Sequence, residues 1–317
     1  MNDSAFPSDL APKALANTSV LDRLQERWKT IVIVLPFVWL LVFFLAPFFI
    51  VAKISLAELE ISSPPFTAMI EWVDGTIVTI RLVFDNFIYI FEDPLYSKTY
   101  LNSIKIAFIS TLLALLLGYP ISYGIVRSNP VTKQLLLFAI ILPFWTSFLL
   151  RVYAWMGLLA DQGTINNLLI SLGLIETPLR MLYTEFAVYV GIVYTYLPFM
   201  ILPLYANMEK LDVTLNEAAA DLGSGPINTF FKITLPLTMP GVIAGALLVF
   251  IPATGEYVIP DLLGGGNVQM IGRQLYNEFA RNIDWPVAAA VAIVLLLILV
   301  LPMAIYQYYQ GRAAERI

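Results

Sequence analysis

The sequence predicts an all-α, polytopic membrane protein with six transmembrane helices. Hydrophobic residues make up 59% of the 317 residues, and the mean hydropathy of +0.79 is well above that of a soluble globular chain. The hydrophobic residues also gather into long runs that polar segments separate, which is typical of helices that cross a bilayer. We therefore expect the spans, and the polar segments between them, to carry the function.

The composition excludes several kinds of chemistry. The chain has no cysteine and no histidine, which removes disulfides, thiolate and imidazole nucleophiles, and the commonest ligands of transition metals. Its formal net charge of −5 and its lack of a basic run argue against nucleic-acid binding. The composition therefore favours binding and movement over covalent catalysis.

The first hydrophobic run follows a polar N-terminal segment. Residues 1–30 are predicted to form a loose tail that ends in a short amphipathic helix around 21–28. Ile31–Ala52 contains 22 residues without a charge, and at about 1.5 Å per residue it spans roughly 30 Å of hydrocarbon. The run is too long for a cleavable signal and lacks a small-residue cleavage site. It is the predicted first span, residues 31–53.

The other five spans are predicted from later runs of the same kind. They are Asn102–Val126, Gln134–Met156, Phe186–Tyr205, Pro240 to about Pro260, and Pro286–Tyr308. An even number of spans places both termini on one side, and ten lysines and arginines fall on that side against seven on the other. Because basic loops stay in the cytoplasm, the sequence predicts cytoplasmic termini.

The predicted outer segments are less regular. Residues 54–100 are acidic, and the stretch Ile77–Phe87 within them predicts a strand or hairpin. This segment has two interpretations, a solvated acidic loop or a docking surface for a partner. The amphipathic stretch Ile165–Ile175 is predicted at the membrane interface, and Gly264–Gly266 is predicted to be flexible.

A polar segment, Leu211–Pro236, lies between the predicted fourth and fifth spans. Thr214, followed three residues later by Glu217, predicts a capping box that starts a helix. Gly223 accepts a left-handed helix stop, and Gly225-Pro226 suits the start of a second helix. The sequence therefore predicts two short helices held at a bend, on the cytoplasmic side.

The spacing of this segment resembles a known motif. From Glu217 the chain reads Glu-Ala-Ala, three residues, Gly223, nine residues, Ile233, one residue, and Leu235-Pro236. This pattern resembles the Glu-Ala-Ala loop of ABC-importer permeases. The resemblance implies a type I (MetI-like) permease core. It also implies that the following residues couple the chain to an ATPase subunit: Glu217, Ala218, Ala219, Gly223, Ile233, Leu235 and Pro236.

The resemblance also divides the chain and places its energy source. It implies a cytoplasmic tail (1–30), a first transmembrane helix (31–53), an acidic periplasmic loop (54–100), a five-helix permease core (101–310) with the coupling loop 211–236, and a cytoplasmic C-terminus (311–317). The chain contains no Gly-Lys pair and hence no P-loop. We therefore expect no cofactor in this chain, with ATP and Mg on the partner ATPase.

Four further stretches resemble one branch of these importers, the permeases for spermidine and putrescine. They are Leu142–Phe148, Arg151–Gly157, Gly255–Pro260 and Leu262–Gly265. The extra first span and the acidic loop resemble the larger putrescine-type permease subunit. The resemblance implies a second permease subunit, two copies of an ABC ATPase and a periplasmic polyamine-binding protein as partners, in the bacterial inner membrane.

A single acidic side chain, Glu256, lies well inside a hydrophobic run, with Asp261 just beyond it. An ionised carboxylate in hydrocarbon costs about 2.5 kcal/mol or more, which favours a polar path beside it. Pro252, Gly255 and Pro260 surround Glu256 with positions that break helices. Glu256 and Asp261 are therefore candidates for a cation path.

Aromatic side chains are the second expected part of that path, because amine cations bind the faces of aromatic rings. Trp145, Tyr196 and Tyr257 are the chosen candidates. The competing interpretation is that these rings belong to interfacial belts, and that Glu256 is structural, either paired with Arg151 or capping the next helical segment.

Three other functions stay open from the sequence alone. The first is an ABC permease for another small solute. The second is a self-contained secondary transporter or channel, in which the lone carboxylate serves proton coupling. A membrane-embedded enzyme is disfavoured, because one buried acid without histidine or cysteine makes a poor catalytic site.

Overall fold

A computed structural model of the chain describes residues 11–73, 77–212 and 214–314. The chain divides into two compact units, Met1–Ile54 and Ser55–Ile317. The first unit is taken up by helix α1 (Ala11–Ser55), which contains the predicted first span. The helix begins at Ala11, within the predicted tail, and residues 1–10 of that tail lie outside the described residues.

Helix α1 carries a long apolar stretch. The stretch Thr30–Ser55 has a mean hydropathy of 2.8, and none of its most apolar window is buried. A helix that is apolar all round is suited to lipid or to another subunit. The length of this helix therefore agrees with the predicted first span.

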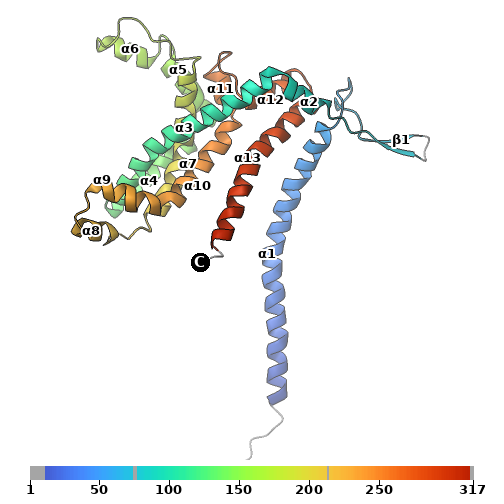
Figure 1. The fold of residues 1–317 in the computed structure, drawn as a ribbon, viewed down its shortest axis with the longest axis horizontal. Helices are drawn as coiled ribbons and strands as arrows, with labels where there is room; N and C mark the ends of the chain where they lie inside the picture. The colour runs from blue at the N-terminus through green and yellow to red at the C-terminus, as the bar shows by residue number, and fades with distance from the viewer. Residues whose placement is uncertain (1–10, 74–76, 213, 315–317) are drawn as a thin grey trace, which may run out of the picture. The chain divides into compact units, whose positions relative to one another are not determined.

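The second unit begins with a small hairpin and continues as helices (Figure 1). Strands β1 (Ile70–Val73) and β2 (Ile77–Ile80) pair antiparallel, with Ile70 opposite Ile80. The helical elements are, in chain order, α2 (Asp85–Glu92), α3 (Pro94–Val126), α4 (Pro130–Ile141), the 3₁₀ turn η1 (Leu142–Trp145), α5 (Phe148–Leu159), α6 (Thr164–Ser171), α7 (Glu185–Met208), α8 (Thr214–Asp221), α9 (Pro226–Thr229), the π-helical turn η2 (Phe230–Thr234), α10 (Leu235–Thr254), α11 (Val258–Leu262), α12 (Ile271–Tyr276), the π-helical turn η3 (Asn277–Arg281) and α13 (Trp285–Ala314).

Four helical stretches of the described chain are long and apolar enough to cross a membrane, and a bent pair makes a fifth. The third predicted span, Gln134–Met156, falls on a bent pair of helices. The chain bends there by 93° between Pro130–Trp145 and Phe148–Ser171. Thr146 has an extended conformation, and its amide and hydroxyl both donate to the Pro143 carbonyl, which ends the first half. The sixth predicted run lies on α13, whose apolar part Trp285–Val300 is shorter.

Helices α3, α7 and α10 form the centre of this unit, where each packs along the other two. The glycines of the Gly241-x-x-x-Gly245 stretch explain how α10 approaches α7 so closely. A Cβ on Gly245 would lie 3.0 Å from the Met200 carbonyl oxygen, and one on Gly241 would lie 3.1 Å from that of Pro203. Small residues therefore allow backbone-to-backbone packing inside this chain.

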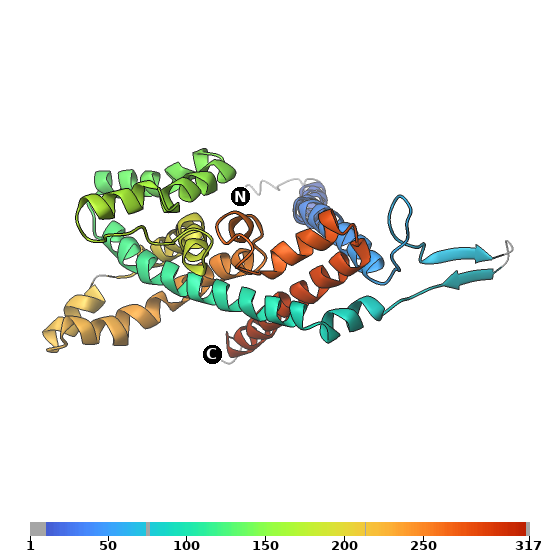
Figure 2. The same ribbon diagram turned by 90° about the horizontal axis from the view of Figure 1, so that it is seen from above.

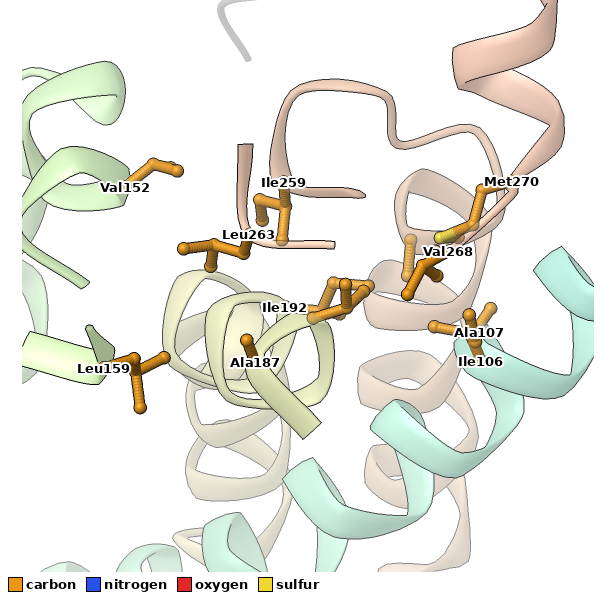
Figure 3. Packing of buried hydrophobic residues seen from close by; sticks show 12 residues of the cluster. Ile106, Ala107, Val152, Leu159, Ala187, Ile192, Ile259, Leu263, Val268 and Met270 are labelled. Atoms are coloured by element: carbon orange, nitrogen blue, oxygen red, sulfur yellow. The ribbon is translucent and has the colours of Figure 1, made fainter. Parts of the chain in front are cut away.

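The largest buried cluster lies where α11 covers α7. Figure 3 shows Ile259 and Leu263 of the α11 segment beside Ile192 of α7, with Val152 contributed by α5 and Ile106 by α3. Gly191 makes this approach possible, because a Cβ there would lie 2.5 Å from the Leu263 side chain. The short α11 is thereby fixed on the core.

The acidic segment is partly anchored rather than freely solvated. Helix α2 packs against α13, with Ile90 buried in a cluster that includes Val287 and Val291. The Asn86 side-chain amide donates to the carbonyls of Ser55 (3.0 Å) and Ala57 (2.8 Å). Of the stretch Ile77–Phe87, predicted as a strand or hairpin, Ile77–Ile80 forms strand β2, whereas residues 85–87 begin helix α2. The β1–β2 hairpin is the exception to the predicted all-α fold.

Candidate functional sites

The Leu211–Pro236 segment forms two helical pieces joined at a bend, as the sequence predicts. Helix α8 ends in a Schellman motif, because the Ser224 amide donates to the Ala219 carbonyl and the Gly223 amide to that of Ala220, both at 2.9 Å. Gly223 has a φ of +79°, a conformation that glycine adopts without steric cost. Helix α9 then begins at Pro226, where proline has no amide hydrogen to leave unpaired.

The start of α8 differs from the predicted capping box. Thr214 is the first helical residue, and its backbone amide donates to Asp212 Oδ1 at 2.9 Å. Asp212 is therefore the capping side chain, and this hydrogen bond holds the pKa of its carboxyl below the usual value. Asp212 was not selected from the sequence, because the pattern Thr214-x-x-Glu217 predicts a helix start two residues later.

The two helical pieces are braced against each other by small polar contacts. The Thr229 hydroxyl donates to Ser224 Oγ at 3.1 Å, and the Thr234 hydroxyl donates to Asn216 Oδ1 at 3.3 Å. Ala219 is buried between them, while Glu217 and Ala218 face outward. The seven predicted coupling residues thus lie on one braced element, with Ile233, Leu235 and Pro236 on the side of α10.

The second helical piece continues directly into the fifth apolar stretch. The π-helical turn η2 joins α9 to α10, so that Pro226–Thr254 forms one helical stretch of 29 residues. Figure 2 shows α8 and α9 (yellow-orange) at the far end of the helical core from α12. A displacement of the bend would therefore act on a continuous helix.

A volume of about 440 Å³ opens beside this bend. Its lining is Tyr119, Pro120, Tyr123, Pro226, Ile227, Phe230 and Phe231. Ile227 and Phe231 have exposed side chains, and so does Leu222 at the end of α8. The segment therefore presents apolar side chains as well as a rigid backbone.

The other candidate site is the break that follows α10. The helix ends at Thr254, and Glu256 lies in the turn before α11. The predicted fifth span, Pro240 to about Pro260, therefore ends about six residues beyond the helix, and the predicted loss of regular helix around Gly255 is correct. Glu256 is 9% exposed.

The Glu256 carboxylate is held by a hydroxyl and two amides. Tyr196 of α7 donates its hydroxyl hydrogen to Glu256 Oε2 at 2.5 Å. The amides of Val258 and Ile259 donate to Oε1 at 3.0 and 3.4 Å, so that the carboxylate caps α11. Of the two structural alternatives from the sequence, capping is the one that forms. Arg151 instead lies against the rings of Phe144 and Phe148.

Glycine places a neighbouring helix against the Glu256 backbone. A Cβ on Gly272 of α12 would lie 2.2 Å from the Gly255 carbonyl oxygen and 2.8 Å from that of Glu256. Only a glycine fits at this contact. No local pattern predicts Gly272 as a site residue, because the contact joins residues that are far apart in the chain.

The remaining predicted path residues are distributed around this break. Asp261 forms an ion pair with Arg273 at 2.8 Å, and Tyr257 stacks on Tyr276 with ring centroids 4.8 Å apart. Trp145 is 74% exposed and packs edge-on against Phe138. Of the five, the described structure joins Tyr196 and Glu256 by a direct hydrogen bond and gives Asp261, Tyr257 and Trp145 other partners.

Two glycines of the triplet next to this site are packed rather than loose. Gly265 has a φ of +56°, and a Cβ there would lie 2.7 Å from the Tyr183 ring. The Tyr183 amide donates to the Leu263 carbonyl, and the Asn267 side chain donates to the carbonyl of Tyr183. The turn at Gly264 and Gly265, which the sequence predicts to be flexible, is therefore closely packed, whereas Gly266 has open space around it.

The chain is similar to known membrane transport proteins. The family model described as binding-protein-dependent transport system inner membrane component matches residues 110–314. The chain is 38% identical over 287 residues to the spermidine/putrescine transport system permease protein PotB of Haemophilus influenzae, covering 90% of this chain and 95% of the relative. It is 42% identical to the protein of the same name from Escherichia coli K12, covering 74% of this chain and 84% of the relative.

Solved structures show the same fold. A bacterial alginate ABC transporter, solved in complex with its alginate-bound periplasmic protein, contains a chain with a TM-score of 0.66 at 16% identity, covering 92% of this chain and 97% of that one. The predicted all-α permease fold is thus confirmed. The apolar helices agree with a multi-pass protein of the inner membrane. The chain belongs to the family of binding-protein-dependent transport system inner membrane components.

Proposed function

We propose that this chain is the permease subunit of an ABC importer that moves polyamines, putrescine foremost, from the periplasm to the cytoplasm. Its relatives at 38% and 42% identity are named for spermidine and putrescine transport. A more distant relative at 32% identity, the inner membrane ABC transporter permease YdcU of Escherichia coli, has no substrate in its name. We therefore base the proposed polyamine substrate on the more similar relatives, those at 38% and 42% identity.

The single observation that carries the proposal is the buried carboxylate of Glu256 beside Tyr196. Each carboxylate oxygen has two lone pairs, and Tyr196 and the α11 amides leave capacity for a further donor. A primary ammonium offers three N–H donors and a full positive charge, which matches an acidic group near aromatic rings. Tyr257, Trp145 and Asp261 are the further proposed path residues, as secondary contacts before or after Glu256.

The proposed energy input is the Leu211–Pro236 segment. Its exposed apolar side chains and its rigid bend suit a groove on a soluble subunit. Glu217, Ala218, Ala219 and Gly223 would contact that subunit, and Ile233, Leu235 and Pro236 would pass its movement into α10. ATP and Mg would bind on the partner ATPase.

The proposed assembly contains a second permease subunit, two ABC ATPase copies and a periplasmic polyamine-binding protein. In this arrangement both termini and the 211–236 coupling loop are cytoplasmic, and residues 54–100 are periplasmic. The binding protein delivers the polyamine to the outer face, and closure of the ATPase dimer moves the coupling loop. The helices then open the path inward, which is alternating access.

A second candidate is an ABC permease for another small solute. It is favoured by the geometry of Glu256 Oε1, which accepts two amide hydrogens and caps α11 whatever the cargo is. A self-contained secondary transporter is a weaker candidate, since it would leave the apolar surface of the coupling loop without a partner. Co-purification of the chain with or without an ATPase subunit separates these two classes.

The test of the polyamine path is uptake by the Glu256→Gln variant in cells that carry the complete transport operon. Glutamine keeps a side-chain oxygen to cap α11 but removes the negative charge, so we expect putrescine uptake to fall about tenfold or more. The matched control is Glu278→Gln. Glu278 is also a buried carboxylate, 7% exposed, and accepts a tyrosine hydroxyl hydrogen from Tyr96 at 2.9 Å.

This control distinguishes the effect of removing any buried charge from the effect of removing the proposed cation contact. We expect Glu278→Gln to lower the melting temperature. Its effect on putrescine uptake per amount of chain in the membrane should be smaller. Unchanged putrescine uptake in Glu256→Gln, with normal abundance, would refute the cation path and favour the other-solute permease.

A further inference from the structure

Arg151 holds an unusual position at the bend of the third apolar stretch. It lies in the first turn of α5, just after the break at Thr146-Ser147. Its guanidinium carbon is 5.3 Å from the ring centroid of Phe144 and 5.9 Å from that of Phe148. Its Nε atom is buried without a hydrogen-bond partner. The guanidinium of Arg151 thus lies against the faces of two aromatic rings.

Other basic side chains on the apolar stretches are paired differently. Lys105 on α3 forms an ion pair with Glu185 at 2.9 Å, and Lys133 on α4 forms one with Glu209 at 2.8 Å. The ion pairs of the described residues do not include Arg151. A charged group in a membrane span usually lies in the bundle interior or beside a polar path. The position of Arg151 therefore calls for a function other than ion pairing.

A row of rings connects Arg151 with the Glu256 break. Phe144, beneath the guanidinium, meets Phe199 of α7 edge to face, with centroids 5.4 Å apart. Phe199 lies 6.2 Å from Tyr196, whose hydroxyl holds Glu256. Phe144 and Phe199 both have exposed side chains. Their rings are thus open to a ligand between a resident cation and a buried carboxylate.

We propose that Arg151 is a resident cation that determines how strongly the path holds an amine. This inference rests on the proposed polyamine function. In the empty path the guanidinium occupies the ring faces of Phe144 and Phe148. An arriving ammonium competes with it for these rings and is repelled by its charge, so the amine is passed on rather than trapped.

The repulsion scales with the charge of the cargo. Putrescine carries two ammonium groups and spermidine three, so removal of the Arg151 charge should prolong the binding of the triamine more than that of the diamine. Slower release lowers the maximal rate of uptake. The ratio of spermidine to putrescine turnover therefore reports the charge of Arg151, whereas a purely structural defect lowers both rates alike.

The experiment measures maximal uptake by the reconstituted complete transporter, at saturating loaded binding protein, for each amine. For Arg151→Met we expect about a fivefold lower rate with spermidine and about a twofold lower rate with putrescine, the size of effect that a cation–ring contact supports. Arg151→Lys keeps the charge and should restore both rates. Arg151→Gln is the second neutral variant, in case the methionine variant does not assemble.

The control is Arg180→Gln, which removes an exposed arginine from the segment between α6 and α7 and should leave the ratio unchanged. An unchanged ratio in the neutral Arg151 variants, or an equal loss for both amines, would overturn the inference while leaving the polyamine function intact. Failure of the wild-type transporter to move either amine would instead overturn the proposed function on which the inference rests.

Discussion

At the scale of single residues, several polar side chains of this protein form hydrogen bonds with backbone groups at the ends of helices. Glu256 caps α11, Asp212 caps α8 and Asn166 donates to the carbonyls of Ala160 and Leu179. Each satisfies backbone groups that a chain break leaves without helical partners. In a molecule with many helix breaks, a side chain to which the sequence assigns another function therefore also caps a helix, as Glu256 does.

Asp212 provides a prediction on pH. Its folded-state pKa lies below the usual value of an aspartate carboxyl, 3.8, chiefly because the Thr214 amide donates to it. Its contribution to helix α8 is therefore fully present above pH 3.8 and is lost as the pH falls through the lower, folded-state pKa. Amide hydrogen-exchange protection in α8 should fall over that range in the wild-type chain.

Asp212→Asn is the test of this assignment. Asparagine can accept the Thr214 amide hydrogen without titrating, so protection of α8 should become independent of pH in the acidic range. Asp221→Asn, on the same helix, is the control and should retain the wild-type profile. A pH-dependent profile that persists in Asp212→Asn would assign the effect to another group.

The residue scale also shows what the sequence could not predict. The Tyr196–Glu256 hydrogen bond joins positions 60 apart in the chain, and no local pattern reports such a contact. Both residues were chosen from their chemistry, but their direct bond depends on how α7 packs beside the break. Gly272 was missed for the same reason.

At the scale of elements, local chemistry predicts turns better than it predicts long helices. The bend at Gly223 and Pro226 follows from residues that lie within it, and it forms as expected. The third apolar stretch gives no such signal, because its break at Thr146 lies within an almost continuous hydrophobic run. Hydropathy measures whether a stretch suits lipid and not whether it is straight.

The contact between α10 and α7 provides an element-scale prediction. A Cβ on Gly245 would lie 2.8 Å from Met200 Sδ and 3.0 Å from the Met200 carbonyl oxygen. Because the backbone oxygen cannot move alone, Gly245→Ala should force the helices apart and cost about 1–3 kcal/mol. We expect a lower melting temperature for the purified complex.

The control is Gly124→Ala on α3, where no atom lies within 4 Å of the added Cβ. This change should leave the melting temperature unchanged or raise it slightly, since alanine favours helix over glycine. Equal melting temperatures for the Gly245 and Gly124 variants would show that the α10–α7 contact adapts without cost.

At the scale of the whole molecule, the two candidate sites lie at opposite ends of one helical stretch. The braced segment 211–236 begins that stretch, and the Glu256 break follows its end. The sequence predicted both locations, because one carries a motif with defined spacing and the other a lone acid in a hydrophobic run. The continuity between them depends on the π-helical turn η2, which no pattern indicated.

This continuity predicts how a change at the bend affects transport. Gly223→Ala places a Cβ at a φ of +79° and should cost about 1–2 kcal/mol, which relaxes the bend. We expect ATP hydrolysis of the assembled transporter to continue while uptake per ATP falls several-fold.

Gly225→Ala is the matched control, because Gly225 has a φ of −69° and open space around its Cβ position. It lies two residues from Gly223 and should leave the ratio of uptake to ATP hydrolysis near the wild-type value. If both variants behave alike, the left-handed conformation is not what makes the bend effective.

The π-helical turn η2 also sets the rotation of the bend about the helix axis relative to the Glu256 break. A π turn holds one more residue than an α turn, and each residue of an α-helix advances by about 100° around the axis. Straightening η2 into regular α-helix would therefore turn α9 about the axis of α10 by roughly that angle. The bend would then present a different face, so five residues, Phe230–Thr234, determine which side of the segment is available for contact.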